Sequence, residues 1–264
     1  MVNLQESMKK FEVEDGNELD YFEVKYGESA PKIMVVSEIW GLTKFIKSFS
    51  RRVAMEGYNV IAPDLYSRKE DKSIFTEENI MDAMRPMWSL PPEKRRDPEA
   101  MNEVIKKLSP TGKKIFEYVS QKREIMEKRM ISDLGHLYEA DMNSHKKKGI
   151  VGFCMGGGLA FQLSTEKHFD ASVIFYGASP RNMEDMAKIK GGVFGIYAGE
   201  DSGINATIPQ VMEKVVNHKI NFEMKMYPGT YHAFFNDTGM SYNREASEDA
   251  WERVKYFYRR NLNE

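Results

Sequence analysis

Short apolar runs alternate along the chain with segments whose apolar positions recur every three or four residues. Each run predicts a β-strand, and the runs lie at 32–37, 58–62, 150–153, 171–176, 193–198 and 222–227. Two further runs, 11–14 and 19–24, flank Asp15-Gly16-Asn17 and predict an antiparallel hairpin. Helical spacing connects the runs, as in Phe45, Phe49 and Val53, and a last helix is expected over about 245–260. This alternation predicts an α/β fold with a mostly parallel sheet covered by helices on both faces.

One stretch, from about residue 66 to about residue 110, interrupts this rhythm. It is charged and carries Pro86, Pro91, Pro92, Pro98 and Pro110, and a long charged helix is expected after it over about 112–142. We interpret the stretch as a cap-like insertion in a single domain that spans residues 1–264, because long loops in compact domains usually have a function. A surface excursion without a function is the alternative.

Composition and charge narrow the class of protein. The 38 Lys and Arg residues nearly balance the 40 Asp and Glu residues, so no overall basic field favours nucleic acid or anionic lipid. No apolar run approaches the length of a membrane span, and the single cysteine cannot form an internal disulfide. We therefore expect a cytoplasmic protein that binds neither nucleic acid nor membranes, as a monomer or a small homo-oligomer.

That single cysteine lies in the sequence Gly152-Phe-Cys-Met-Gly-Gly-Gly158, between a predicted strand and a helix-like segment from Leu159 to Lys167. This layout is typical of a nucleophile elbow in which Cys154 stands where most such hydrolases carry serine. Glycines suit the turn because the strand and the helix approach closely there. A buried apolar filler is the alternative for the cysteine. A turn that binds phosphate is less consistent with the sequence, since neither G-x-G-x-x-G nor G-x-x-x-x-G-K-[ST] occurs in the chain.

A catalytic thiol needs a base and a group that orients the base, and both should follow later strands. Among the downstream histidines, His232 follows the predicted strand 222–227, whereas His168 and His218 are expected on the surface. Asp201 follows the strand 193–198 and is our candidate for the orienting acid, with Glu200 as the fallback. The alternative for Asp201 is a turn or helix-capping residue.

With these residues in place, the chain resembles the dienelactone hydrolase family. The resemblance rests on five blocks in the same order, 35–42, 58–66, 152–157, 199–201 and 228–232. It implies a three-layer α/β-hydrolase sandwich and a carboxylic ester hydrolase of carboxymethylenebutenolidase type, without a cofactor. It also implies a catalytic triad of Cys154, His232 and Asp201, and a fourth functional residue at Glu38.

Glu38 ends a buried run, where a carboxylate is costly unless it is paired or hydrogen-bonded. The resemblance implies that it interacts with the resting thiol of Cys154 and helps to deprotonate it when substrate arrives. We expect the oxyanion hole to consist of the backbone amides of Met155 and Ile39. The alternative for Glu38 is an ion pair with a structural arginine such as Arg51 or Arg52.

The region expected to bind substrate departs from the family's pattern. Family members bind the substrate carboxylate partly through a serine directly after the catalytic histidine and an arginine a few residues later. Here Ala233 follows His232, and no arginine lies near Asn236. Our candidates for an altered pocket are Arg85, Trp88 and Tyr66. The alternative for each is ordinary packing of the cap.

Together these features predict a hydrolase that opens an activated ester, an enol lactone of dienelactone type, through a cysteine thioester acyl-enzyme. Two alternatives remain open. One is a broad-specificity carboxylesterase or thioesterase, and the other is a non-enzymatic ligand-binding or redox-sensing protein with a reactive thiol. No metal site is expected, because the cysteine and the histidines lack ligand spacing.

Overall fold

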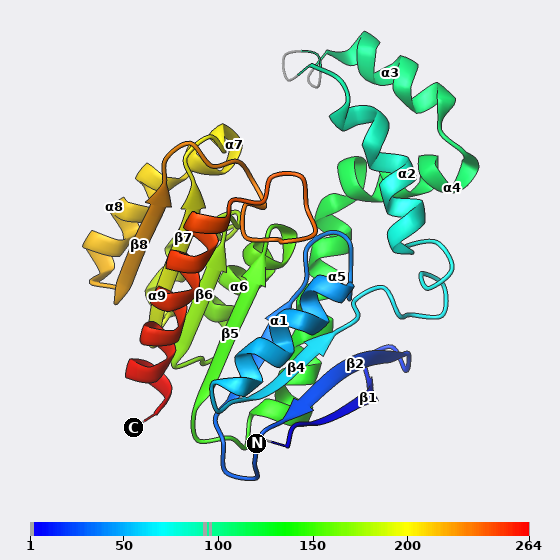
Figure 1. Ribbon diagram of the computed structural model, residues 1–264. Helices are drawn as coiled ribbons and strands as arrows, with labels where there is room; N and C mark the ends of the chain where they lie inside the picture. Colours follow the sequence, from blue (N-terminus) through cyan, green and yellow to red (C-terminus); the bar gives the residue numbers. More distant parts are fainter. Residues whose placement is uncertain (1–2, 92–93, 95–96, 264) are drawn as a thin grey trace.

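The computed structural model describes residues 3–91, 94 and 97–263, and their strands form one eight-stranded sheet (Figure 1). The strand order is β1 (Gln5–Glu12), β2 (Glu18–Lys25), β4 (Asn59–Pro63), β3 (Lys32–Val36), β5 (Lys148–Phe153), β6 (Ala171–Phe175), β7 (Gly192–Ala198) and β8 (Phe222–Tyr227). The first two strands form the expected hairpin, and β2 runs antiparallel to β4. All remaining pairs are parallel, which confirms the predicted α/β class.

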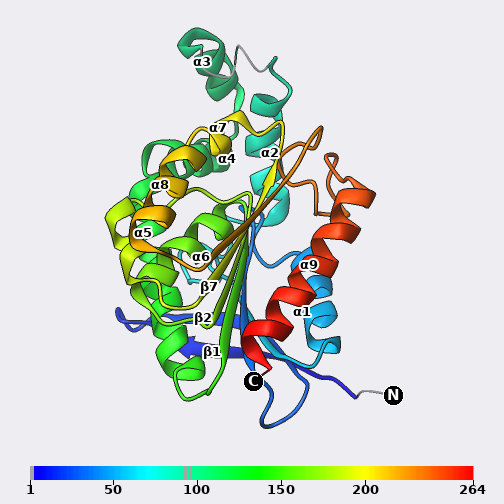
Figure 2. The same ribbon diagram turned by 90° about the vertical axis from the view of Figure 1, so that its left-hand side faces the viewer.

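Helices cover both faces of this sheet. One face carries α1 (Lys44–Met55) and α9 (Arg244–Leu262), and the other carries α5 (Arg123–Leu137), α6 (Met155–Glu166) and α8 (Ile208–His218), as Figure 2 shows. In β3, Ile33 and Val35 belong to the apolar cluster on the α1 and α9 face, while Met34 and Val36 belong to the opposite cluster. A strand buried on both faces therefore reads as the continuous apolar run seen in the sequence.

Aromatic packing fixes the end of β5, where the lone cysteine follows. The ring of Phe153 meets that of Phe49 edge-on at 4.9 Å and stacks on Phe175 at 4.7 Å. Phe45 and Phe235 complete the group, with ring centroids 5.3 and 5.8 Å from that of Phe153. Each buried aromatic ring contributes about 1.5–3 kcal/mol of burial energy, so the strand end is held firmly.

The stretch between β4 and β5 is helical over most of its described length. It contains α2 (Glu77–Trp88), α3 (Pro98–Lys107), α4 (Pro110–Phe116), a π-helical segment η2 (Glu117–Gln121), then α5 and a second π-helical segment η3 (Tyr138–Met142). Figures 1 and 2 show α2 and α3 rising beyond the carboxyl end of the sheet. The prediction of one long helix over 112–142 is wrong, because the backbone at Lys122 leaves the helical region with φ −105° and ψ 15°.

Buried ion pairs attach this helical stretch to the sheet domain. Arg68 follows β4 and is 3% exposed, and its Nε donates to the carboxylate of Asp133 in α5 at 3.2 Å. The Arg68 guanidinium also pairs with Asp15 in the β1–β2 turn, and Arg129 of α5 pairs with the buried Asp71. These pairs tie α5 to the chain that leads into α2.

Candidate active site

The turn after β5 has the geometry of the predicted elbow. Cys154 has φ 55° and ψ −117°, a backbone conformation that residues other than glycine rarely adopt, and α6 begins at the next residue. Its amide donates to the carbonyl of Phe175 at 3.0 Å, and its carbonyl accepts from the amide of Gly158 at 3.1 Å. Neighbouring strands and the new helix therefore hold the strained residue in place.

Glycines make this turn possible for a steric reason. A Cβ on Gly152 would lie 1.9 Å from the carbonyl oxygen of Gly156, and a Cβ on Gly156 would lie 2.3 Å from the carbonyl oxygen of Ser37. Both contacts are with backbone atoms, which cannot move aside as a flexible side chain can. The elbow thus depends on direct backbone contact between β5, α6 and the end of β3.

Asp201 and His232 come together as the order of the strands predicts. Asp201 lies three residues after β7, and its Oδ2 is hydrogen-bonded to Nδ1 of His232 in the loop after β8. Asp201 precedes the short helix α7 (Ser202–Asn205) but makes no side-chain cap, so the capping alternative is not supported. His168 and His218 lie apart from this group and are partly exposed beside Asp170 and Glu184.

His232 also contacts the cysteine. Burial alone lowers the pKa of His232, but the negative charge of Cys154 in its thiolate form and the hydrogen-bonded Asp201 carboxylate raise this pKa to about 10. The ring of Tyr176 packs against the imidazole with centroids 5.0 Å apart. The three residues thus form a connected chain from thiol to imidazole to carboxylate.

Glu38 is buried next to this chain, with 2% of its surface exposed. Asn236 donates to its Oε2 at 2.7 Å, while no partner within the described residues bonds to its Oε1. Burial raises the pKa of Glu38 to about 7, against the lowering effects of the Asn236 hydrogen bond and of His232. Arg51 pairs instead with Glu6, and Arg52 lies over the ring of Trp251, so an ion pair of Glu38 with either arginine is not supported.

The two backbone amides expected to form the oxyanion hole belong to Met155 and Ile39. Met155 is the first residue of α6, and Ile39 follows Glu38 in the loop after β3. In the described part of the chain, neither amide donates to a backbone carbonyl. Free amides at a helix start attract negative charge, as an oxyanion hole requires.

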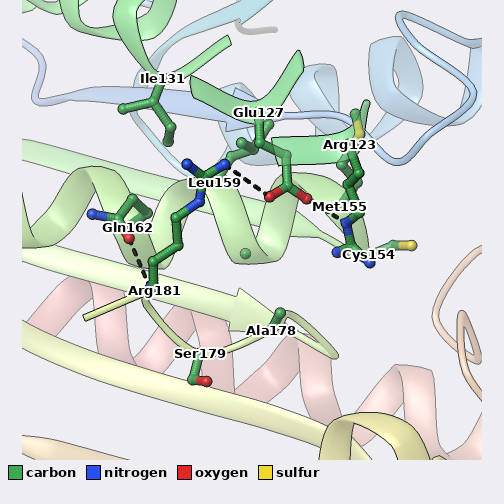
Figure 3. Close-up of a pocket in the computed structure, with 11 residues that line it drawn as sticks. Arg123, Glu127, Ile131, Cys154, Met155, Leu159, Gln162, Ala178, Ser179 and Arg181 are labelled. Carbon is green, nitrogen blue, oxygen red and sulfur yellow. Dashed lines mark hydrogen bonds and ion pairs between the residues drawn. The ribbon is translucent and has the colours of Figure 1, made fainter. Parts of the chain in front are cut away.

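A small pocket lies beside the cysteine and opens to solvent (Figure 3). Its walls come from the elbow, from α5 and α6, and from the loop after β6; the polar residues among them are Arg123, Glu127, Gln162, Ser179 and Arg181. None of these five residues was predicted from the sequence. They lie on helix surfaces and in a loop, where charged residues are common, so nothing in the sequence distinguishes them.

The three pocket residues expected from the sequence lie elsewhere. Arg85 is exposed on α2, and Trp88 at the end of α2 meets Trp40 edge-on at 5.0 Å. Tyr66 is buried and stacks on Phe75 at 4.8 Å, and Cys154 is among the groups that raise its pKa, after burial. None of the three lines the cavity beside the cysteine. Tyr66 alone among them is electrostatically coupled to the thiol.

Two other kinds of feature are absent from the described residues. Among residues 3–91, 94 and 97–263, no group of three or more His, Cys, Asp or Glu side chains is arranged to hold a metal ion. No helix in the same residues has both the length and the apolarity needed to cross a bilayer.

Comparison with known proteins identifies the family of the chain. The model of the dienelactone hydrolase family matches residues 21–262. The chain belongs to the dienelactone hydrolase family. This confirms the resemblance drawn from the sequence and makes the protein a hydrolase with the α/β-hydrolase fold.

Several relatives are similar over nearly their whole length. A protein of Saccharolobus solfataricus named "Putative carboxymethylenebutenolidase" is 49% identical over 86% of this chain and 88% of the relative. The crystal structure of a dienelactone hydrolase from Anabaena variabilis superposes with a TM-score of 0.65 at 14% identity, covering 98% and 99% of the two chains. That of a dienelactone hydrolase-like promiscuous phosphotriesterase from metagenomic libraries has a TM-score of 0.70 at 17% identity, with the same coverage. At such identities the two structures support the fold alone.

Proposed function

We propose that this hydrolase cleaves an activated carboxylic ester, an enol lactone of dienelactone type, with Cys154 as nucleophile. The observation that carries the proposal is the chain of contacts from Cys154 to His232 to Asp201, at the carboxyl ends of β5, β8 and β7. A nucleophile bonded to a base, which is itself oriented by a carboxylate, is the arrangement that covalent acyl transfer requires. The name of the Saccharolobus relative supports the same substrate class.

The reaction follows from the positions of these groups. The Cys154 sulfur attacks the ester carbonyl carbon, and the amides of Met155 and Ile39 bind the oxygen that gains negative charge. The carbon–oxygen bond of the ester then breaks, the protonated His232 gives its proton to the leaving enolate, and a thioester remains. Water attacks this thioester while the neutral His232 takes its proton. Sulfur leaves as the thiolate, and the carboxylic acid is released.

Glu38 is a candidate acceptor for the proton of the Cys154 thiol. A carboxyl group whose pKa is about 7 exchanges a proton readily near neutral pH, and its Oε1 has no other partner in the described residues. We propose that Glu38 receives the Cys154 proton as substrate enters and returns it to the Cys154 thiolate after the acid has left. The thiol therefore rests protonated, in the form less prone to oxidation.

A thiolate nucleophile favours substrates that have a good leaving group. A thiolate is itself a good leaving group, so a tetrahedral intermediate with a poor leaving group returns to substrate. Enol esters and lactones release a stabilised enolate and therefore proceed. A broad carboxylesterase or thioesterase is the second candidate, favoured by Ala233 and by the missing arginine near Asn236, which leave the family's carboxylate contacts unmade.

Two substrates test the proposal on the purified protein. We expect the wild type to hydrolyse both a dienelactone and p-nitrophenyl acetate, with higher kcat/KM on the lactone. Cys154→Ser should lose at least about 10³-fold on both. Hydrolysis of neither substrate by the wild type would overturn the proposed function, while a preference for the simple ester would favour the broad esterase.

We propose the cytoplasm as the compartment of this hydrolase, since its single cysteine forms no internal disulfide.

A further inference from the structure

Two arginines reach the same cavity as the nucleophile. Arg123 starts α5 and Arg181 lies in the loop after β6, and both line the pocket that contains Cys154 (Figure 3). Neither corresponds to the arginine that the family resemblance expects near Asn236. The cavity therefore has a cationic wall of its own.

One carboxylate links the two guanidinium groups. Arg123 Nε donates to Oε1 of Glu127 at 2.7 Å, and Arg181 Nη2 donates to Oε2 of the same residue at 3.2 Å. Arg181 is held further by the backbone carbonyl of Glu124 at 3.0 Å, and its amide donates to Gln162 at 3.0 Å. The arginines are thus fixed in place, and a single shared carboxylate does not neutralise both.

The remaining charges nearby do not change this balance. The Glu124 carboxylate lies 4.0 Å from Arg181 Nη1, but it pairs more closely with Lys128 at 2.9 Å. Counting these groups, three cations face two carboxylates. The wall of the cavity keeps a net positive charge.

Part of the Arg123 guanidinium group has no hydrogen-bond acceptor among the described residues. Its Nε is bonded to Glu127, whereas its Nη1 and Nη2 meet no acceptor in the part of the chain that the structure describes. The residue also occupies the start of a helix, where the dipole disfavours a cation, directly after the π-helical segment η2 and the break at Lys122. Such interruptions of a helix are frequent at functional sites. Arg244 has the same place at the start of its helix and lies outside the cavity, so the unbonded Nη groups beside Cys154, and not the helix start, are the feature that points to a ligand.

We propose that Arg123, braced by Glu127 and Arg181, binds a carboxylate carried by the substrate in the cavity beside Cys154. The fork of its two free Nη groups matches the two oxygens of a carboxylate. The inference rests on the proposed function for its substrate, an ester or lactone with a carboxylate. It assigns recognition of that carboxylate to α5 and the β6 loop.

The lone cysteine allows a test that does not depend on ester hydrolysis. Iodoacetate and iodoacetamide both alkylate a thiolate with loss of iodide, and they differ mainly in the charge of iodoacetate. The ratio of their rate constants at Cys154 therefore reports on cationic recognition in the cavity. We expect Arg123→Ala to lower this ratio about tenfold, equivalent to about 1.4 kcal/mol.

Arg244 provides a matched control. It is also the first residue of its helix, and its Nε donates to the glutamate four residues later at 2.7 Å, as in Arg123 and Glu127. It lies outside the cavity. Arg244→Ala should leave the alkylation ratio at the wild-type value, and Arg123→Lys should recover part of it.

A pair of esters extends the test to turnover. The p-nitrophenyl monoester of glutaric acid carries a free carboxylate, and its methyl ester does not. Arg123→Ala should lower the ratio of kcat/KM between them about tenfold, mainly through KM. An unchanged alkylation ratio, or an equal loss on both esters, would overturn the inference. A changed alkylation ratio with no hydrolysis by the wild type would support it and remove the proposed function instead.

Discussion

The two walls around Cys154 are stabilised in different ways. On the sheet side, backbone atoms meet backbone atoms, as where Gly156 lies against the end of β3. On the helix side, charged side chains join α5 to its surroundings, through Arg68 with Asp133 and through Glu127 with two arginines. Backbone contact fixes the geometry of the reaction closely, whereas side-chain pairs can be replaced without moving the nucleophile. The geometry around Cys154 therefore depends on the sheet side, while the charge of the cavity depends on side chains of the helix side.

The largest effect is expected where the sheet side is broken. In Gly156→Ala the new Cβ would meet two carbonyl oxygens at 2.3 and 2.4 Å, so β3 and α6 must separate. We expect a loss of about 4–5 kcal/mol in the free energy of unfolding, measured in urea, together with loss of activity. Gly203→Ala is the control, because a Cβ there meets nothing within 4 Å and should stabilise α7 slightly. Similar stability in both variants would contradict the steric account.

Breaking a buried ion pair on the helix side should lower the free energy of unfolding by a smaller amount. Asp133→Ala leaves Arg68 buried but still paired with Asp15, so we expect a loss of about 3 kcal/mol, at the low end for a broken buried pair. The exposed pair of Lys188 with Asp185 provides the contrast, since Asp185→Ala should cost less than about 1 kcal/mol. Thermal unfolding of both variants would measure this, and equal shifts would show that α5 is not anchored by its buried charges.

The smallest change expected in the free energy of unfolding concerns Glu38; it is a gain and depends on pH. The pKa of Glu38 rises from 4.5 to about 7 on folding, so the folded state binds more protons than the unfolded state between these values. Glu38 therefore does not lower the free energy of unfolding below pH 4.5, where it is protonated in both states. Its contribution to stability is lost as pH rises through 7, where the buried group ionises. Glu38→Gln cannot ionise, and we expect it to be about 2 kcal/mol more stable than the wild type at pH 8 but not at pH 4. An equal difference at both pH values would contradict the burial argument, and the variant should lose activity at either.

The sequence predicted the sheet side better than the helix side for a physical reason. Buried parallel strands leave continuous apolar runs, and the turn at Cys154 requires glycine, so both features are visible in the amino-acid order. Asn236, which holds Glu38, was missed because one polar residue in a loop carries no pattern. Arg123 was missed because its place in the cavity depends on the break at Lys122, which the helical spacing of 112–142 did not reveal.

The central claim is that Cys154 carries the acyl group during the reaction. Intact-mass spectrometry after rapid mixing with a slow p-nitrophenyl ester tests it directly, in His232→Ala, where attack by water on the thioester lacks its base. We expect one acyl group per chain, located on Cys154 by peptide mapping and removed by hydroxylamine at neutral pH, as for a thioester. Steady hydrolysis by wild-type protein with no adduct in either form, or an adduct that remains in Cys154→Ser/His232→Ala on another residue, would contradict the account.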